Sequence, residues 1–271
     1  LPEMIYGNMP LEGGFLKLSE LEKDNIINTY PQAQKFIRPT IGGDEFLKSI
    51  KRWCIWIEDE DLKSALEIPP IAQRVQGVRD FRTNGGEVAR TLVERSHQFR
   101  YRHTAKNQMM IVPCTSSENR DYIQCGFFSS EYISMNSVQV ILDPELWVFG
   151  VLSSKMHMIW VKAVAGRLES RIRYSNRICY NTFPCPDFND ENKEVLTELS
   201  IAILSARERH LNTTVGNLYR KGAMPSDLLS AHLALDTYFE SLYKTNPLKN
   251  DDEILETLLK QYVQMTGNKN A

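Results

Sequence analysis

Residues 153–177 have the sequence SSKMHMIWVKAVAGRLESRIRYSNR, and the hydrophobic period changes within this stretch. In its first part apolar residues recur at intervals of three and four, which predicts an amphipathic helix capped by Ser153 or Ser154. Gly166 is a common type of helix stop. From Gly166 to Ser175 charged and apolar residues alternate, which predicts a β-strand. A helix that leads directly into a strand indicates an α+β fold.

The predicted strand has one apolar and one charged face. The apolar set is Leu168, Ser170, Ile172 and Tyr174, and the charged set is Arg167, Glu169, Arg171 and Arg173. The charged face has two explanations, an ordinary solvated surface or a surface that contacts DNA bases. Arginine can donate two hydrogen bonds to guanine, and glutamate can accept one from the cytosine amino group. Because an acidic residue among arginines weakens phosphate binding, Glu169 favours base recognition over charge attraction alone.

The rest of the chain extends this architecture in both directions. Ser19 and Glu22 have the spacing of a capping box, and residues 71–82 are predicted to be helical. Short β-type runs occur at 52–57 and between 108 and 142. After Pro186 the predicted elements are all helical, at 195–209, 226–243 and 251–265. We therefore predict a mixed-sheet domain over residues 1–186 and a small all-α region over residues 187–271. Within the all-α region, Leu228, Ala231 and Leu235 have the spacing of a helix-packing seam.

The composition is that of an ordinary globular protein. A chain of 271 residues can bury a substantial core, and it contains no run of about 20 apolar residues that could span a membrane. The five cysteines are odd in number and have no Cys-x-x-Cys spacing, which predicts reduced thiols and a cytoplasmic location. The chain begins at Leu1 without a signal-peptide pattern, and we expect it to be part of a longer protein.

The net charge of −2 hides a basic middle region. Residues 70–186 contain 15 Lys and Arg against 9 Asp and Glu, whereas residues 1–69 and 187–271 are each acidic. A basic region between acidic ones could bind an anionic partner such as nucleic acid. Ordinary solvated surface explains the same distribution, so charge alone does not decide between them.

Residues 42–46, Gly-Gly-Asp-Glu-Phe, match the signature of diguanylate cyclases. Those enzymes need a nucleotide- and metal-binding segment well upstream, and the 41 residues before Gly42 contain none. We favour a structural turn that opens toward the strand of Trp53, with a nucleotide cyclase as the enzyme alternative and a protein-interaction module as a third. His157, alone in its helix, is expected to be packed or hydrogen-bonded. With no P-loop, nucleophile elbow or zinc-protease motif, the chain is predicted to be non-catalytic.

Several longer motifs occur in an order that resembles a known enzyme family. They are YGNMPLEGG, FIRPTIGGDEF, RWCIW, VPCTSSENRDYIQCGF, FGVLSSKMHMIWVKAVAGRLESRIRYS, YNTFPCP and MPSDLLSAHLALD. Together they span nearly the whole chain and resemble the C-terminal portion of the MmeI-like single-chain restriction–modification enzymes, types IIG and IIL. In that family a nuclease domain and an adenine-N6 methyltransferase domain precede a target recognition domain and a helical C-terminal region.

The resemblance implies a role and a set of residues. The chain would recognise a short double-stranded DNA site and present an adenine to the methyltransferase domain, which lies outside it. S-adenosylmethionine, and Mg²⁺ for cleavage, would serve the parent protein, and this portion would bind neither. The family positions linked to base choice correspond to Glu169, Arg171 and Arg173, with Asn136 or Ser137 as a partner. Arg120 and Arg167 are further candidate DNA contacts.

Overall fold

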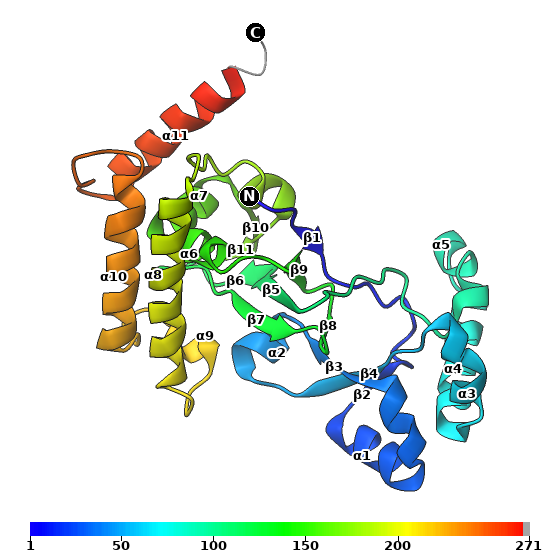
Figure 1. Cartoon of the computed structure of the whole chain (residues 1–271). Helices are drawn as coiled ribbons and strands as arrows, with labels where there is room; N and C mark the ends of the chain where they lie inside the picture. The colour runs from blue at the N-terminus through cyan, green and yellow to red at the C-terminus, as the bar shows by residue number, and fades with distance from the viewer. Residues whose placement is uncertain (268–271) are drawn as a thin grey trace. The chain divides into compact units, whose positions relative to one another are not determined.

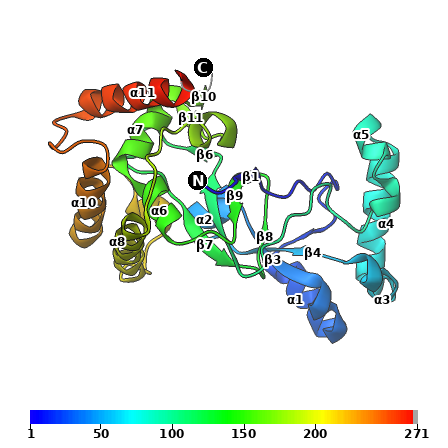
Figure 2. The same ribbon diagram turned by 45° about the horizontal axis from the view of Figure 1, so that its top comes forward.

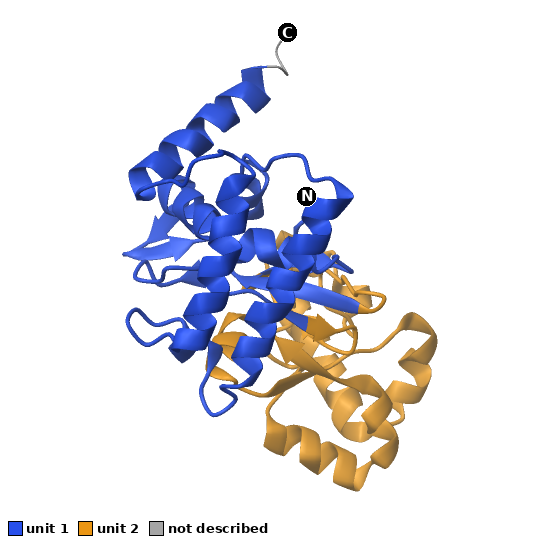
Figure 3. Ribbon diagram, turned by 60° about the vertical axis from the view of Figure 1, so that its left-hand side comes forward, with its two compact units in different colours: residues 1–5, 108–127, 139–271 blue, residues 6–107, 128–138 orange. Residues whose placement is uncertain are grey.

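The computed structural model describes residues 1–267, which form two compact units (Figure 3). Unit 1 contains residues 1–5, 108–127 and the described residues from 139 onward, and unit 2 contains residues 6–107 and 128–138. Each unit is thus assembled from separate stretches of the chain. The sequence boundary at residues 186 and 187 stays a prediction.

Unit 1 contains two sheets, one of which includes residues 166–173. A four-stranded sheet in the order β1-β9-β5-β7 lies mainly in this unit, and a second, antiparallel sheet has the order β10-β11-β6 (Figure 1). Their bounds are β1 (Ile5–Tyr6), β5 (Gln108–Pro113), β6 (Thr115–Ser116), β7 (Gly126–Ser129), β9 (Val138–Leu142), β10 (Gly166–Leu168) and β11 (Arg171–Arg173).

The helices of unit 1 share one hydrophobic core. They are α6 (Trp147–Ser153), α7 (Lys155–Val164), the π-helical turn η4 (Asn176–Tyr180), α8 (Asp190–Glu208), α9 (Val215–Leu218), α10 (Ser226–Ser241) and α11 (Asp251–Gly267). Helix α8 packs beside α6 and α10, and α11 packs on α7 (Figures 1 and 2). Leu228 and Leu235 are fully buried and Ala231 packs against the same core, which confirms the predicted seam.

Unit 2 combines a small mixed sheet with short helices. The sheet order is β2-β4-β3-β8, and β3 and β8 are its parallel pair. Its strands are β2 (Lys17–Leu18), β3 (Ile37–Ile41), β4 (Arg52–Ile55) and β8 (Ile133–Ser134); its helices are α1 (Glu20–Thr29), α2 (Gly43–Lys48), α3 (Leu62–Leu66), α4 (Pro69–Thr83) and α5 (Glu87–Arg90), with 3₁₀ turns η1 (Pro31–Phe36), η2 (Asp59–Asp61) and η3 (Val93–Arg95). Ser19 and Glu22 form the predicted capping box of α1. The α+β prediction is confirmed.

The predicted single strand from Gly166 to Ser175 is wrong. The chain reverses at Glu169 and Ser170, so this stretch is a hairpin of β10 and β11 in which Leu168 pairs with Arg171. Glu169 has a φ of 58°, and a positive φ at the first of two loop residues is the arrangement of type II′ hairpin turns. The turn changes which side chains share a face.

No helix within residues 1–267 combines the length and the apolarity needed to cross a membrane.

Candidate nucleic-acid interface

The β10–β11 hairpin presents arginines on an exposed surface above a buried residue. Arg171 and Arg173 are exposed, while Ile172 between them is fully buried. Residues directly opposite each other in an antiparallel pair lie on the same face of a sheet. Leu168, opposite Arg171, therefore lies on the arginine face and is 45% exposed. Arg167 lies opposite Ile172, so the predicted grouping of Leu168 with the core and of Arg167 with the other arginines is wrong.

The charged residues of the hairpin differ in their contacts. Arg171 Nη2 lies 2.9 Å from Glu169 Oε2, and both side chains are largely exposed. The side chain of Arg173 forms no hydrogen bond or ion pair with any residue of the described chain. Arg167 Nη2 donates to the carbonyl of Lys162 at 2.8 Å, which ties β10 to the end of α7. Arg171, Arg173 and Glu169 thus have polar groups accessible to a ligand.

The hairpin rests on a rigid, buried base. Strand β11 pairs with β6 so that Arg173 lies opposite Thr115, and the Tyr174 backbone N–H donates to the carbonyl of Cys114 at 2.9 Å. The hydroxyl of Tyr174 contacts His157 Nε2 at 3.0 Å, and both residues are buried. Burial lowers the pKa of His157 to about 3, so its ring is neutral at physiological pH. His157 is therefore a packed and hydrogen-bonded residue, as predicted.

Asn136 and Ser137 lie in unit 2, in the turn between β8 and β9, and both are exposed. They line a surface cleft of about 680 Å³ together with Lys17, Lys51 and Arg52. The Ser137 hydroxyl accepts a hydrogen bond from the Gly43 backbone N–H at 3.0 Å. The sequence analysis missed these three basic residues, because they come from segments more than 80 residues away in the chain.

Arg120 has a different environment from the hairpin arginines. Its side chain is partly buried, and Nη1 donates to the carbonyl of Gly216 in α9 at 3.0 Å. Burial lowers the pKa of this guanidinium. The contact with α9 ties the segment after β6 to the helical part of unit 1.

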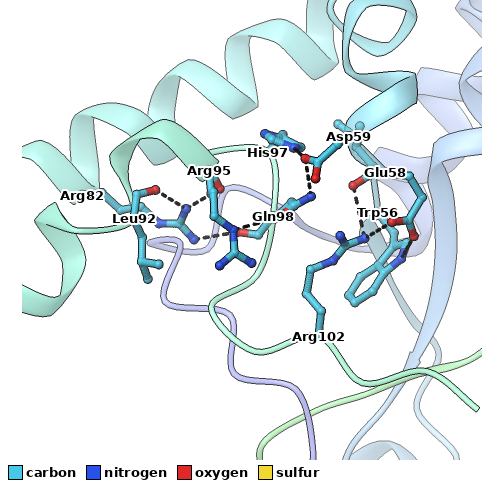
Figure 4. A network of polar contacts seen from close by, with 10 residues as sticks. Trp56, Glu58, Asp59, Arg82, Leu92, Arg95, His97, Gln98 and Arg102 are labelled. Carbon is cyan, nitrogen blue, oxygen red and sulfur yellow. Dashed lines mark hydrogen bonds and ion pairs between the residues drawn. The ribbon is translucent and has the colours of Figure 1, made fainter.

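Much of the basic charge of the middle region is used inside unit 2. Arg82 is fully buried and donates to five backbone carbonyls, three of which belong to Leu92, Arg95 and Gln98 (Figure 4). In the same unit, Arg102 pairs with Glu58 at 2.8 Å (Figure 4). The positive charge of residues 70–186 is therefore not one continuous binding surface.

The Gly-Gly-Asp-Glu-Phe stretch forms the start of α2. Asp44 pairs with Lys48, and Glu45 pairs with Arg52, each at 3.0 Å. A Cβ atom at Gly42 would lie 2.5 Å from both Glu45 Oε2 and Ser137 Oγ, so a larger residue here would have to displace these two side chains. Close packing and local ion pairs explain the motif, so its role is structural as predicted, but the stretch begins a short helix where a turn was predicted. Among residues 1–267, no group of three or more His, Cys, Asp or Glu is arranged to hold a metal ion.

Comparisons with known proteins match the whole described chain. Residues 1–187 match the family model for the MmeI target recognition domain, and residues 188–268 match the model for the MmeI C-terminal domain. DNA methyltransferase A of Bacillus subtilis (strain 168) is 37% identical over 267 residues, which cover 98% of this chain and 30% of the relative. The solved structure of the type IIL restriction-modification enzyme MmeI in complex with DNA superposes with a TM-score of 0.94 at 35% identity, and the match covers 98% of this chain and 36% of that one. This chain thus spans only about a third of each relative.

Proposed function

The chain belongs to the MmeI family, in which it corresponds to the target recognition and C-terminal domains, and we propose that it binds a short, asymmetric double-stranded DNA site. In the full-length protein it would position an adenine for a methyltransferase domain that this chain does not contain. An enzyme that modifies a base must take it out of the stacked duplex, so recognition has to place the adenine beside the active site.

The exposed hairpin is the observation that carries this proposal. Arg171 and Arg173 project from a sheet whose opposite face has Ile172 and Ser116 buried, so their backbone positions are held before any ligand binds. Arg171 would donate to O6 and N7 of a guanine, and Glu169 would accept from the amino group of a cytosine. Their ion pair in the free protein keeps both groups close to one another. We assign Arg173 to a neighbouring base pair.

The backbone at Glu169 supports a functional use of this side chain. A φ of 58° is unfavourable for a residue with a Cβ, and glycine or asparagine would adopt it at lower cost. Strained positions of this kind are concentrated at functional sites. A glutamate at the tip of an exposed turn makes no packing contribution that would offset the strain, whereas a base contact would.

The other candidate residues have supporting roles in this proposal. Asn136 or Ser137 would contact a base, with Lys17 and Lys51 beside them for phosphates; Arg52 of the same cleft is paired with Glu45. Arg167 and Arg120 would act through the contacts that hold the hairpin and the segment after β6. S-adenosylmethionine, and Mg²⁺ for any cleavage, would bind to the methyltransferase and nuclease parts of the parent, in a cytoplasmic protein.

The first experiment is a duplex-binding titration of the chain at several salt concentrations. DNA binding should weaken with salt, with a log–log slope of about −0.9 for each phosphate contact. Binding without salt dependence, or none at low salt by a folded sample, contradicts DNA recognition. If the chain instead captures a protein partner and ignores DNA, it is a protein-interaction module.

The second experiment replaces Glu169 and Arg171 in the full-length protein by another acid–base or amide pair. The methylated sites of the variant are then mapped by sequencing. One position of the recognised motif should change or relax, because the loss of one base contact costs about 1–3 kcal/mol of discrimination there. The matched control replaces Arg79 and Glu94 in the same way. These residues form an exposed ion pair with the same 2.9 Å separation in unit 2, and their replacement should leave the motif unchanged. An unchanged motif with uniformly weaker methylation in the hairpin variant would make this face ordinary solvated surface.

A further inference from the structure

The segment Arg120–Cys125 follows β6 and is bound at three points by helices of the C-terminal region. Arg120 donates to Gly216 of α9, Tyr122 contacts Asp236 of α10, and the carbonyl of Cys125 accepts a hydrogen bond from Arg207 of α8 at 2.6 Å. The Gln124 side chain of this segment accepts a hydrogen bond from the Ser116 hydroxyl of β6 at 3.1 Å. The strand beside β11 is thereby connected to three separate helices.

The β10-β11-β6 sheet is called the recognition sheet from here on. The Asp236 carboxylate contacts two chain segments that flank it, one after β6 and one before β10. Its Oδ2 accepts a hydrogen bond from the Tyr122 hydroxyl at 2.7 Å, and its Oδ1 accepts one from the Lys155 backbone N–H, also at 2.7 Å. Tyr122 lies downstream of β6, and Lys155 begins α7, the helix that leads into β10. One buried side chain of α10 therefore contacts both the segment that follows β6 and the start of α7, the helix that precedes β10.

A second chain of hydrogen bonds holds the same segment from α8. Arg207 Nε donates to the Tyr219 hydroxyl at 2.8 Å, and that hydroxyl contacts His232 Nε2 at 2.7 Å. Burial, with a smaller effect of Arg207, lowers the pKa of His232 to about 3, so its ring is neutral at physiological pH. The ring of His232 stacks on Tyr122 with centroids 4.0 Å apart. Arg207 of α8 is thus connected to Tyr122 through Tyr219 and His232.

We propose that α8 and α10 set the position of the recognition sheet, with Tyr122 and Asp236 as positioning residues for base discrimination. This inference rests on the proposed function, since it assigns the helical region a part in DNA recognition. None of these side chains lies on the exposed face of the hairpin, so they act through the backbone of Arg120–Cys125 and the start of α7. A misplacement of the sheet by a fraction of an ångström would weaken base contacts that depend on hydrogen-bond geometry.

The test compares Tyr122→Phe, Asp236→Asn and Asp236→Ala with the wild-type chain. The control is Tyr243→Phe, which removes the hydroxyl of a partly buried tyrosine of unit 1, bonded to the carbonyl of Pro184 at 3.0 Å. Hydrogen exchange followed by mass spectrometry measures the opening of residues 115–125 and 166–173. A selection from randomised duplexes with the wild type provides a preferred site, and the affinity ratio between that site and a scrambled duplex measures discrimination.

Tyr122→Phe and Asp236→Ala should speed exchange in both segments about tenfold, the effect of losing a hydrogen bond to a charged group. They should also lower the affinity ratio about fivefold or more, as the loss of a base contact does. Asp236→Asn keeps an oxygen that can accept from Lys155 and should retain part of both properties, whereas Tyr243→Phe should leave both unchanged.

The outcomes separate this inference from the function on which it rests. If wild type selects no site, the proposed function fails and the inference fails with it. If wild type selects a site but Tyr122→Phe keeps its exchange rates and its affinity ratio, only the inference is overturned. Faster exchange with an unchanged ratio also overturns it, because the contacts would then stabilise the fold without positioning the bases.

Discussion

The hairpin in unit 1 and the surroundings of Arg82 in unit 2 use arginine in opposite ways. Arg171 and Arg173 stand on an exposed sheet face, whereas the guanidinium of Arg82 is fully buried and donates to five backbone carbonyls. Burial, and after it the charge of Arg95, lowers the pKa of Arg82, whereas the nearby Glu12 carboxylate opposes that shift and the five carbonyl oxygens accept hydrogen bonds from the guanidinium. The number of arginines in a region therefore does not predict a binding surface unless the burial of each side chain is known.

The largest loss of stability is expected when the buried Arg82 is replaced. Arg82→Met should lower the free energy of unfolding by about 3–5 kcal/mol, because five carbonyls in two chain segments, residues 10–11 and 92–98, lose their donor. Chemical denaturation measures this, with Arg79→Met as the control. Arg79 is on the same helix but half exposed in a surface ion pair, so its loss should cost less than about 1 kcal/mol.

Leu235 tests the converse, a buried residue that supports the fold but does not touch DNA. Leu235→Ala should destabilise the chain by about 2–5 kcal/mol, as large-to-small changes in a packed core do. Leu233→Ala, two residues away and 52% exposed, should change stability by less than about 0.5 kcal/mol. If Leu235→Ala melts like wild type yet loses DNA binding, the helix seam contacts DNA and the division between the two regions is wrong.

Asp236 in unit 1 is a buried carboxyl group, in contrast to the exposed charged residues of the hairpin. Burial raises the pKa of Asp236 from 3.8 to about 6. The folded chain therefore takes up a proton at a pH where the unfolded chain does not, and stability from this group increases as pH falls from about 7 toward 4. The stability of wild type relative to Asp236→Asn should rise by about 2 kcal/mol over that range. Unfolding at several pH values measures it, and a flat difference contradicts the burial of this carboxyl.

The smallest expected effect is at the turn of the hairpin. Glu169→Asn should raise the free energy of unfolding by about 0.5–1 kcal/mol, because asparagine tolerates the positive φ better than glutamate. The same variant should relax one position of the recognised motif. A gain in stability with unchanged base choice would mean that Glu169 is a structural accident of the turn.

Local signals were sufficient for most of the secondary structure. The capping box at Ser19, the N-cap at Ser154 and the spacing of Leu228 and Leu235 each depend on residues within about two helical turns, and each is confirmed. These patterns express hydrogen bonds and packing that form between near neighbours in the chain. The α+β class followed from them.

The hairpin shows where such signals stop. Alternation with period two continues unchanged through Glu169 and Ser170, so the pattern of a hairpin with a two-residue loop is the same as that of one strand. The turn nevertheless exchanges the faces, because Leu168 and Arg171, which a single strand would place on opposite faces, become direct partners on the same one. A glycine or asparagine at the turn would have revealed it, and neither is present.

Residue types at short spacing were enough to predict most of the elements, the α+β class and the resemblance to the MmeI family, but not the β10–β11 hairpin. Only the tertiary structure decided which charged groups are exposed. The donors of Arg82 reach carbonyls as far as 72 residues away, and Tyr122 meets Asp236 across 114 residues. Burial is a property of such long-range contacts, and no local period encodes it. The same physics leaves Arg171 and Arg173 exposed on their hairpin, where they are accessible to DNA.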